Sequence, residues 1–208
     1  YNTFSDADSV DHAKFGADLL FKDGLISTFL NGMVKCTGYK PGALEDRYSS
    51  DGVFLYDRLN KSDMEMLELA IRCHNMYRIP QGLNRREQAF CNVLRDADKV
   101  DIFKVNIDTP LEEIYNTTTE ELMKSDITDE VLEAFDEEHC ILKAIRRTPA
   151  DTVIGHVSLA YELVYDESVR ITVEQGYLAK LMHFHSDNEE TNRKMAMVRD
   201  CLLYTSDA

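Results

Sequence analysis

The sequence lacks a long hydrophobic run. None of its apolar stretches approaches the roughly 20 residues that a helix needs to span a bilayer, so we expect no function in a membrane. A signal peptide is absent as well, but the chain opens on Tyr1 without a methionine. We therefore expect the natural start of the protein to lie upstream of this residue.

Paired cysteines and an excess of basic charge are also missing. The five cysteines are an odd number, lie far apart and include no C-x-x-C pair, which argues against a disulfide framework and a structural zinc site. Reduced thiols in a cytoplasmic protein are the simplest interpretation. The net charge of −15 opposes binding of a nucleic-acid duplex through a broad basic face. Any phosphate must then be bound locally, by a metal or by a few Arg and Lys side chains.

Signals for β-strands are missing too. The sequence has no run of alternating β-branched residues, no glycine-rich phosphate loop and no internal repeat. Most segments instead have apolar residues at helical spacing, which predicts an all-α fold, and 208 residues suit one domain. A loop is expected over 36–60, which holds three Gly and one Pro. Helices are expected over 11–21, 23–34, 64–77, 87–105, 109–123 and 128–139, and again between 151 and 185.

Short capping signals indicate where some of these helices begin. A Ser, Thr, Asp or Asn followed three residues later by Glu satisfies free backbone N–H groups at a helix start. The expected signals are an N-cap at Asp8 or Ser9, capping boxes at Ser62–Glu65 and Asn84–Glu87, and a turn over 80–82.

Three of the expected helices each place one metal-competent side chain on an apolar face. His12 shares such a face with Phe15, Gly16 and Leu19, and His74 follows a stripe of Leu67, Ala70 and Ile71. On the 87–105 helix, Asp98 lies at the edge of the apolar arc. Imidazole together with carboxylate suits a divalent cation such as Mn, Fe, Zn or Mg.

The other acidic residues of the "VLRDADKVDIF" segment divide between the two faces of the same helix. Asp101 falls on the apolar side with Phe90, Leu94 and Ala97. Asp96 falls on the polar side with Arg95 and Lys99, so we expect it to be solvated.

The spacing alone leaves a structural interpretation open. An inward histidine is more often a hydrogen-bonded core residue than a ligand, and an inward aspartate more often caps a helix or pairs with an arginine. The periodicity does not decide between these interpretations and a shared metal site.

Three segments resemble successive blocks of the HD superfamily of metal-dependent phosphohydrolases: "DHAKFGADLLF", "AIRCHNMYRIPQGL" and "FCNVLRDADKVDIFKV". The resemblance covers about residues 4–106. It implies an HD-domain-like helical bundle in which His12, His74 and Asp98 bind one or two divalent metals. Asn75 and Asp101 would then be outer partners that orient the ligands.

The resemblance also implies an activity. A cation would polarise a phosphoryl oxygen and activate a water molecule, and the substrate would be a phosphate monoester or a nucleotide. Lys99, Arg72 and Arg78 are candidates for phosphate binding, although each is more often a solvated charge. The substrate, the metal and the oligomeric state stay open.

The sequence departs from the family pattern in one essential respect, because no His-Asp dipeptide occurs in it. The resemblance implies that the Asp of that pair would be both a metal ligand and the expected organiser of the water, so the catalytic residues are unknown. We interpret the chain as a fragment: 1–106 a partial HD-domain core incomplete at the N-terminus, 107–203 helices packing on the same domain, and 204–208 a non-native tail. "CLLYTSDA" resembles translated adapter sequence and would interrupt the last helix.

As supplied, the chain is therefore expected to have little or no hydrolase activity. The alternative function is a catalytically dead helical module that binds a nucleotide or a protein partner and keeps the histidines and aspartates as a polar network. A purely structural bundle is a third interpretation, which the three matched blocks disfavour.

Overall fold

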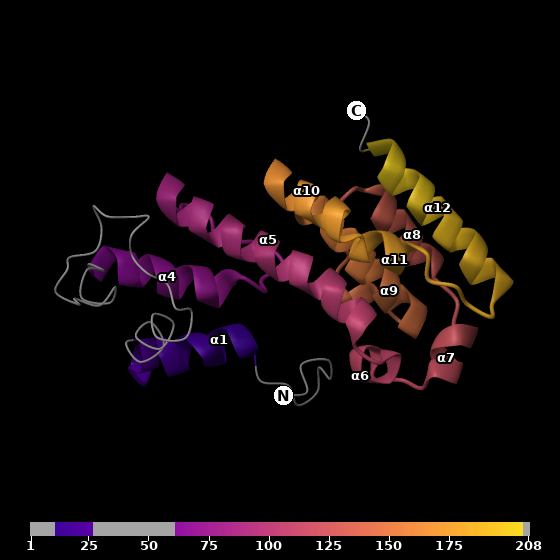
Figure 1. Ribbon diagram of the computed structural model, residues 1–208, viewed down its shortest axis with the longest axis horizontal. Helices are drawn as coiled ribbons and strands as arrows, with labels where there is room; N and C mark the ends of the chain where they lie inside the picture. The colour runs from indigo at the N-terminus through magenta and orange to yellow at the C-terminus, as the bar shows by residue number, and fades with distance from the viewer. Residues whose placement is uncertain (1–10, 27–60, 206–208) are drawn as a thin grey trace. The chain divides into compact units, whose positions relative to one another are not determined.

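The computed structural model describes residues 11–26 and 61–205. Every regular element within these ranges is helical, as the sequence predicted (Figure 1). Most of the helix expected over 23–34 and the whole loop expected over 36–60 lie outside the described residues. None of the described helices has the length and apolar character needed to cross a membrane.

The described residues form two compact units that meet inside one helix, α5 (Arg85–Asp108). Residues 11–26 and 61–94 belong to the first unit, and residues 95–205 belong to the second. The boundary expected at residue 106 also falls inside α5.

The first unit contains α1 (His12–Ala17), the short π-helix η1 (Asp18–Lys22) and α4 (Lys61–Cys73). Helices α1 and α4 pack against each other. Its buried cluster consists of small side chains, Ala70, Cys73 and Cys91, with Leu69, Ile79, Leu83 and Leu94 packed around them. Ala13 and Ala17 of α1 are fully buried.

The second unit contains the rest of α5 and a set of shorter helices. These are α6 (Leu111–Tyr115), α7 (Thr119–Lys124), α8 (Asp129–Asp136), η3 (Lys143–Ile145), α9 (Pro149–Val157), η4 (Ser158–Glu162), α10 (Asp166–Gln175), α11 (Tyr177–Met182) and α12 (Glu189–Thr205). Helix α9 contacts α7, α8 and α11. Its Val153, Ile154 and Val157 are fully buried in an aliphatic core that also holds Phe103 and Phe135.

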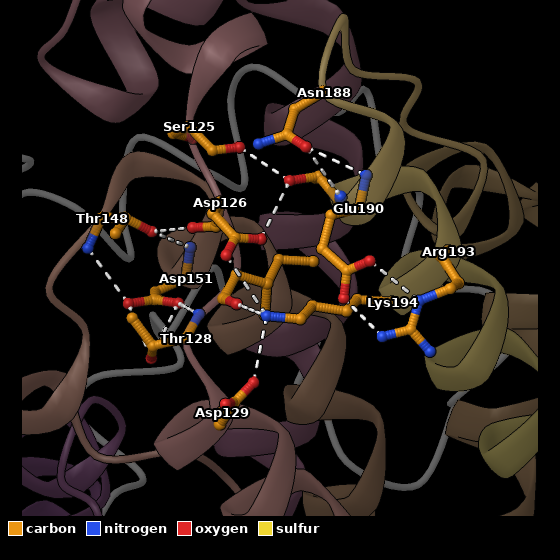
Figure 2. A network of polar contacts seen from close by, with 12 residues as sticks. Ser125, Asp126, Thr128, Asp129, Thr148, Asp151, Asn188, Glu190, Arg193 and Lys194 are labelled. Carbon is orange, nitrogen blue, oxygen red and sulfur yellow. Dashed lines mark hydrogen bonds and ion pairs between the residues drawn. The ribbon is translucent and has the colours of Figure 1, made fainter.

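A polar network joins the starts of α8, α9 and α12 in the second unit (Figure 2). The fully buried Asp151 accepts hydrogen bonds from the backbone N–H groups of Thr128, Arg147 and Thr148 at 2.8–3.0 Å. Lys194 of α12 approaches Asp126 at 3.3 Å and Asp129 at 3.1 Å, and it donates to the carbonyl of Ile127. Charges and free N–H groups at these helix ends thereby satisfy one another.

Two of the expected local signals are confirmed. Asn84 and Glu87 form a reciprocal capping box, with Glu87 N donating to Asn84 Oδ1 at 3.0 Å and Asn84 N donating to Glu87 Oε2 at 2.9 Å. The turn over 80–82 places Gly82 at φ +82°, where a glycine avoids steric strain.

Other local expectations were wrong. Ser62 is not an N-cap, because α4 is already helical at Lys61. The N-cap of α1 is Asp11, not Asp8 or Ser9. Helix α12 continues through Cys201 to Thr205, so the expected interruption does not occur there.

The apolar faces of two helices are oriented differently from the expectation. On α1 the buried positions are Ala13 and Ala17, whereas His12 is exposed and Phe15 is 38% exposed. On α5 Val93 is 57% exposed, and Asp96, expected to be solvated, is 1% exposed.

The buried face of α5 is polar because another segment supplies partners for it. Asp96 accepts hydrogen bonds from the backbone N–H groups of Val164 and Tyr165, just before α10, at 3.0–3.1 Å. Arg95 pairs with Glu162 at 3.3 Å. Periodicity along one helix cannot detect such partners, which lie about 70 residues away in sequence.

Candidate metal centre

His12 is the first residue of α1, and the preceding residue fixes that turn. Asp11 Oδ1 accepts hydrogen bonds from Ala13 N at 3.1 Å and Lys14 N at 3.2 Å, which satisfies two free donors of the helix start. The imidazole of His12 therefore extends from a capped helix start and not from a loose loop.

His74 directly follows α4, and the backbone of that helix fixes its tautomer. Its Nδ1 lies 2.7 Å from the carbonyl oxygen of Ile71. A carbonyl can only accept, so Nδ1 must carry the hydrogen, and in the neutral ring the lone pair is on Nε2. This nitrogen thus carries the lone pair that a metal ligand or a hydrogen-bond acceptor needs.

The two histidines meet through these Nε2 atoms, which lie 3.0 Å apart. The ring centroids are 5.0 Å apart and the ring planes are tilted by 54°. Nitrogen ligands bound at about 2.1 Å and at a right angle to one ion would be separated by about 3.0 Å. The same distance also suits a hydrogen bond between a protonated and an unprotonated nitrogen.

Asp98 is the carboxylate that the sequence nominated together with this pair. It lies on α5 one helical turn beyond Leu94, and it is partly buried. It belongs to the second unit, whereas His12 and His74 both belong to the first. Two imidazoles and a carboxylate fit a borderline divalent cation, and three protein ligands leave positions for water.

The expected outer partners differ in where they lie. Asn75 Nδ2 donates to Asp11 Oδ1 at 3.2 Å, which links the residue after His74 to the cap of the helix that carries His12. Asp101 is exposed to solvent, so the expectation that it faces inward was wrong.

The three candidate phosphate-binding residues are in different environments. Arg72 Nη2 binds Asp18 at 2.5 Å and Glu68 at 2.7 Å, and these hydrogen bonds, chiefly the one to Asp18, raise the pKa of Arg72. Arg78 is exposed, with its guanidinium 5.6 Å from the Tyr77 ring centroid.

Lys99 is not the solvated charge that the sequence indicated. It is 5% exposed and makes one long hydrogen bond, from Nζ to the carbonyl of Arg95 at 3.5 Å. Burial lowers the pKa of the Lys99 ammonium. Of the three candidates, only Arg78 is both exposed and clear of a carboxylate partner in the contacts described here.

Asp11 is the residue at this centre that the sequence interpretation missed. Burial acts to raise its pKa, but hydrogen bonds from Lys14 and then from Asn75 outweigh it and lower the pKa of Asp11 to about 2. The signal was present, because an Asp immediately before a helical segment is a frequent N-cap.

Comparisons with known proteins add nothing to this geometry: no family model matches the chain, and no curated protein or solved structure matches it significantly.

Proposed function

We propose that this chain is part of a metal-dependent phosphohydrolase, in which His12, His74 and Asp98 hold a divalent cation and the chain as given has little or no hydrolase activity. The observation that carries the proposal is the approach of His12 Nε2 to His74 Nε2, at 3.0 Å within the first unit. Periodicity and the family resemblance nominated the same three residues from the sequence.

The hydrogen bond of His74 favours ligation. Nδ1–H is directed to the Ile71 carbonyl, and metal-bound histidines commonly donate their other ring N–H to such an acceptor. The lone pair of Nε2 then faces His12 Nε2 without a change of tautomer. Little reorganisation would be needed for both imidazoles to bind one ion.

A bound divalent cation would polarise a phosphoryl oxygen and lower the pKa of a water molecule toward neutrality. The residues of this chain would fix the position of that ion. A phosphate monoester or nucleotide is the substrate class that suits this chemistry. The sequence contains no His-Asp dipeptide, so the residue that orients the water is left unassigned.

The experiment is a Co²⁺ titration followed by absorption spectroscopy and calorimetry. We expect the wild type to bind Co²⁺, and His12→Ala, His74→Ala and Asp98→Ala each to abolish tight binding. Asp101→Ala is the matched control, because Asp101 lies on the same helix but is exposed. Equal Co²⁺ affinity in the Asp98 and Asp101 variants would contradict the proposal.

A second function is supported by the same contact. If His12 Nε2–H donates to His74 Nε2 at 3.0 Å, the pair is satisfied without an ion, as in a helical module that binds a nucleotide or a protein without catalysis. Failure of Mn²⁺, Co²⁺ and Zn²⁺ to bind a folded wild-type chain would favour this module. Mn²⁺-dependent hydrolysis of p-nitrophenyl phosphate that Asp98→Ala abolishes would favour the phosphohydrolase, and it would also overturn the expectation that the chain as given is inactive.

A further inference from the structure

We infer that Asp11 is a positioning residue that holds His12 close to His74. It does so by joining the start of α1 to Asn75, the residue that follows His74. The inference deepens the proposed metal centre and rests on it for its functional meaning. Asp11 is not itself a member of the group of three ligands.

A single oxygen atom makes this connection. Asp11 Oδ1 accepts from Ala13 N, Lys14 N and Asn75 Nδ2 at 3.1, 3.2 and 3.2 Å. The first two bonds hold the first turn of α1, where His12 is the first helical residue. The third bond ties that turn to the position next to His74. One carboxylate therefore restrains both histidine backbones relative to each other.

The other oxygen of the carboxylate is held as well. Asp11 Oδ2 lies 2.9 Å from Lys14 Nζ. An ionised carboxylate makes stronger hydrogen bonds to N–H donors than a neutral acceptor does. With both oxygens engaged, the carboxylate has a defined orientation in spite of its partial exposure.

A second polar contact joins the same two helices at a different place. Arg72 of α4 binds Asp18, which follows α1, and Arg72 Nη1 donates to the Lys14 carbonyl at 3.5 Å. This contact stabilises the packing of α1 on α4 but does not include the residues next to the histidines. It therefore offers a matched control for general loosening of the helix pair.

The experiment compares four variants by two measurements. The first is the nuclear Overhauser effect between the His12 and His74 rings in the metal-free protein, and the second is Co²⁺ affinity. Asn75→Ala removes only the cross-link. Asp11→Ser keeps an N-cap residue but is too short to reach Asn75. Asn75→Asp places a second carboxylate opposite Asp11, and Arg72→Gln removes the other contact.

We expect Asn75→Ala and Asp11→Ser to weaken the ring-to-ring effect and to lower Co²⁺ affinity by about 10- to 100-fold, as loss of an outer partner of a ligand does. Asn75→Asp should be at least as damaging. Arg72→Gln should lower the melting temperature yet change Co²⁺ affinity less than threefold.

The inference is overturned if Asn75→Ala and Asp11→Ser retain both the ring contact and wild-type affinity, or if Arg72→Gln lowers affinity as much as they do. A wild type that binds no Co²⁺ would defeat the proposed function. The ring contact in the metal-free variants would still decide whether Asp11 positions His12.

Discussion

At the scale of single residues, two buried aspartates of this protein accept hydrogen bonds from backbone N–H groups. Asp96 is 1% exposed and accepts from two backbone N–H groups before α10, and Asp151 does the same at the start of α9. A carboxylate can be buried when its oxygens accept hydrogen bonds from the protein, because these bonds replace the ones it made to water. These residues therefore serve the fold and are not catalytic candidates.

Asp96→Ala should be strongly destabilising, because it leaves the N–H groups of Val164 and Tyr165 without their carboxylate acceptor. The expected loss in the free energy of unfolding is about 2–3 kcal/mol, measured by urea denaturation followed by circular dichroism. Asp101→Ala on the exposed side of the same helix should change it by less than about 0.5 kcal/mol. Similar losses in the two variants would contradict the assignment of the buried face.

His156 should make the stability depend on pH. Its Nδ1 lies 2.7 Å from Asn106 Oδ1, which also accepts from Tyr115 OH at 2.8 Å. Burial, and then the positive charges of Arg146 and Lys143, lower the pKa of His156 from 6.5 to about 3. Between these two values the unfolded chain binds more protons than the folded chain, so stability is full above pH 6.5 and falls as the pH falls toward 3.

The corresponding measurement is urea denaturation at pH 7.0, 5.5 and 4.0. From pH 7 to pH 4 the wild type should lose about 3 kcal/mol more than His156→Gln, which keeps a polar side chain but does not titrate. Parallel pH profiles for the two proteins would show that His156 is not held neutral by the fold.

The identity of the candidate ligands came from sequence motifs, but the environment of the residues around them could not be predicted. His12, His74 and Asp98 were nominated by helical periodicity and by the three segments that resemble the HD superfamily, and their binding of a metal stays a prediction. The burial of Asp96 and Lys99 could not be predicted, since their surroundings come from segments such as Val164–Tyr165 that the local pattern does not include.

At the scale of elements, two helical glycines differ in the space that surrounds them. A Cβ at Gly155 of α9 would lie 2.2 Å from the Arg146 guanidinium, whereas a Cβ at Gly16 of α1 meets no described atom within 4 Å. Arg146 Nη2 donates to the Ile141 carbonyl at 2.5 Å and to the Gly155 carbonyl at 3.5 Å. Gly155 thus makes room for an arginine that satisfies backbone carbonyls.

Gly16→Ala should raise the free energy of unfolding by about 0.5–1 kcal/mol, because alanine has the higher helix propensity. Gly155→Ala should lower it by about 1 kcal/mol or more, because displacing Arg146 costs its hydrogen bonds and disturbs packing. Thermal and urea denaturation of both variants test this. Combining Gly155→Ala with Arg146→Met should recover part of the loss, and failure to recover any of it would contradict the explanation.

The existence of the helices was predicted more accurately than the residues at which they begin and end. Helical periodicity correctly predicted that the regular elements over residues 11–26 and 61–205 are all helices, and it predicted the helices around residues 64–77 and 87–105. The Asn84–Glu87 capping box was identified because both of its members lie within four residues. The cap of α1 at Asp11 was missed because several acidic or hydroxylic residues near that start could serve equally well.

At the scale of the whole molecule, apolar burial is unevenly distributed between the two units. The second unit has a large aliphatic and aromatic core that includes Phe103, Leu122, Phe135, Ile154 and Met195. The buried cluster of the first unit, among the residues described, consists of Ala70, Cys73 and Cys91. Burial of apolar area is the main stabilising contribution in folding, so the helices of the first unit should open more readily.

Hydrogen exchange followed by mass spectrometry should therefore show faster exchange in α1 and α4 than in α9 and α12. Co²⁺ at 100 times its dissociation constant should stabilise the state that binds it by about 2.7 kcal/mol. Because His12 is the first residue of α1 and His74 directly follows α4, this stabilisation should slow exchange in these two helices by up to about 100-fold and leave α9 and α12 unchanged. Asp98→Ala should abolish the effect of Co²⁺ without altering exchange in α12. If Co²⁺ slowed hydrogen exchange equally in all helices, the ion would bind elsewhere or would stabilise the chain as one cooperative unit. Either result would contradict a metal centre that is built on α1 and α4.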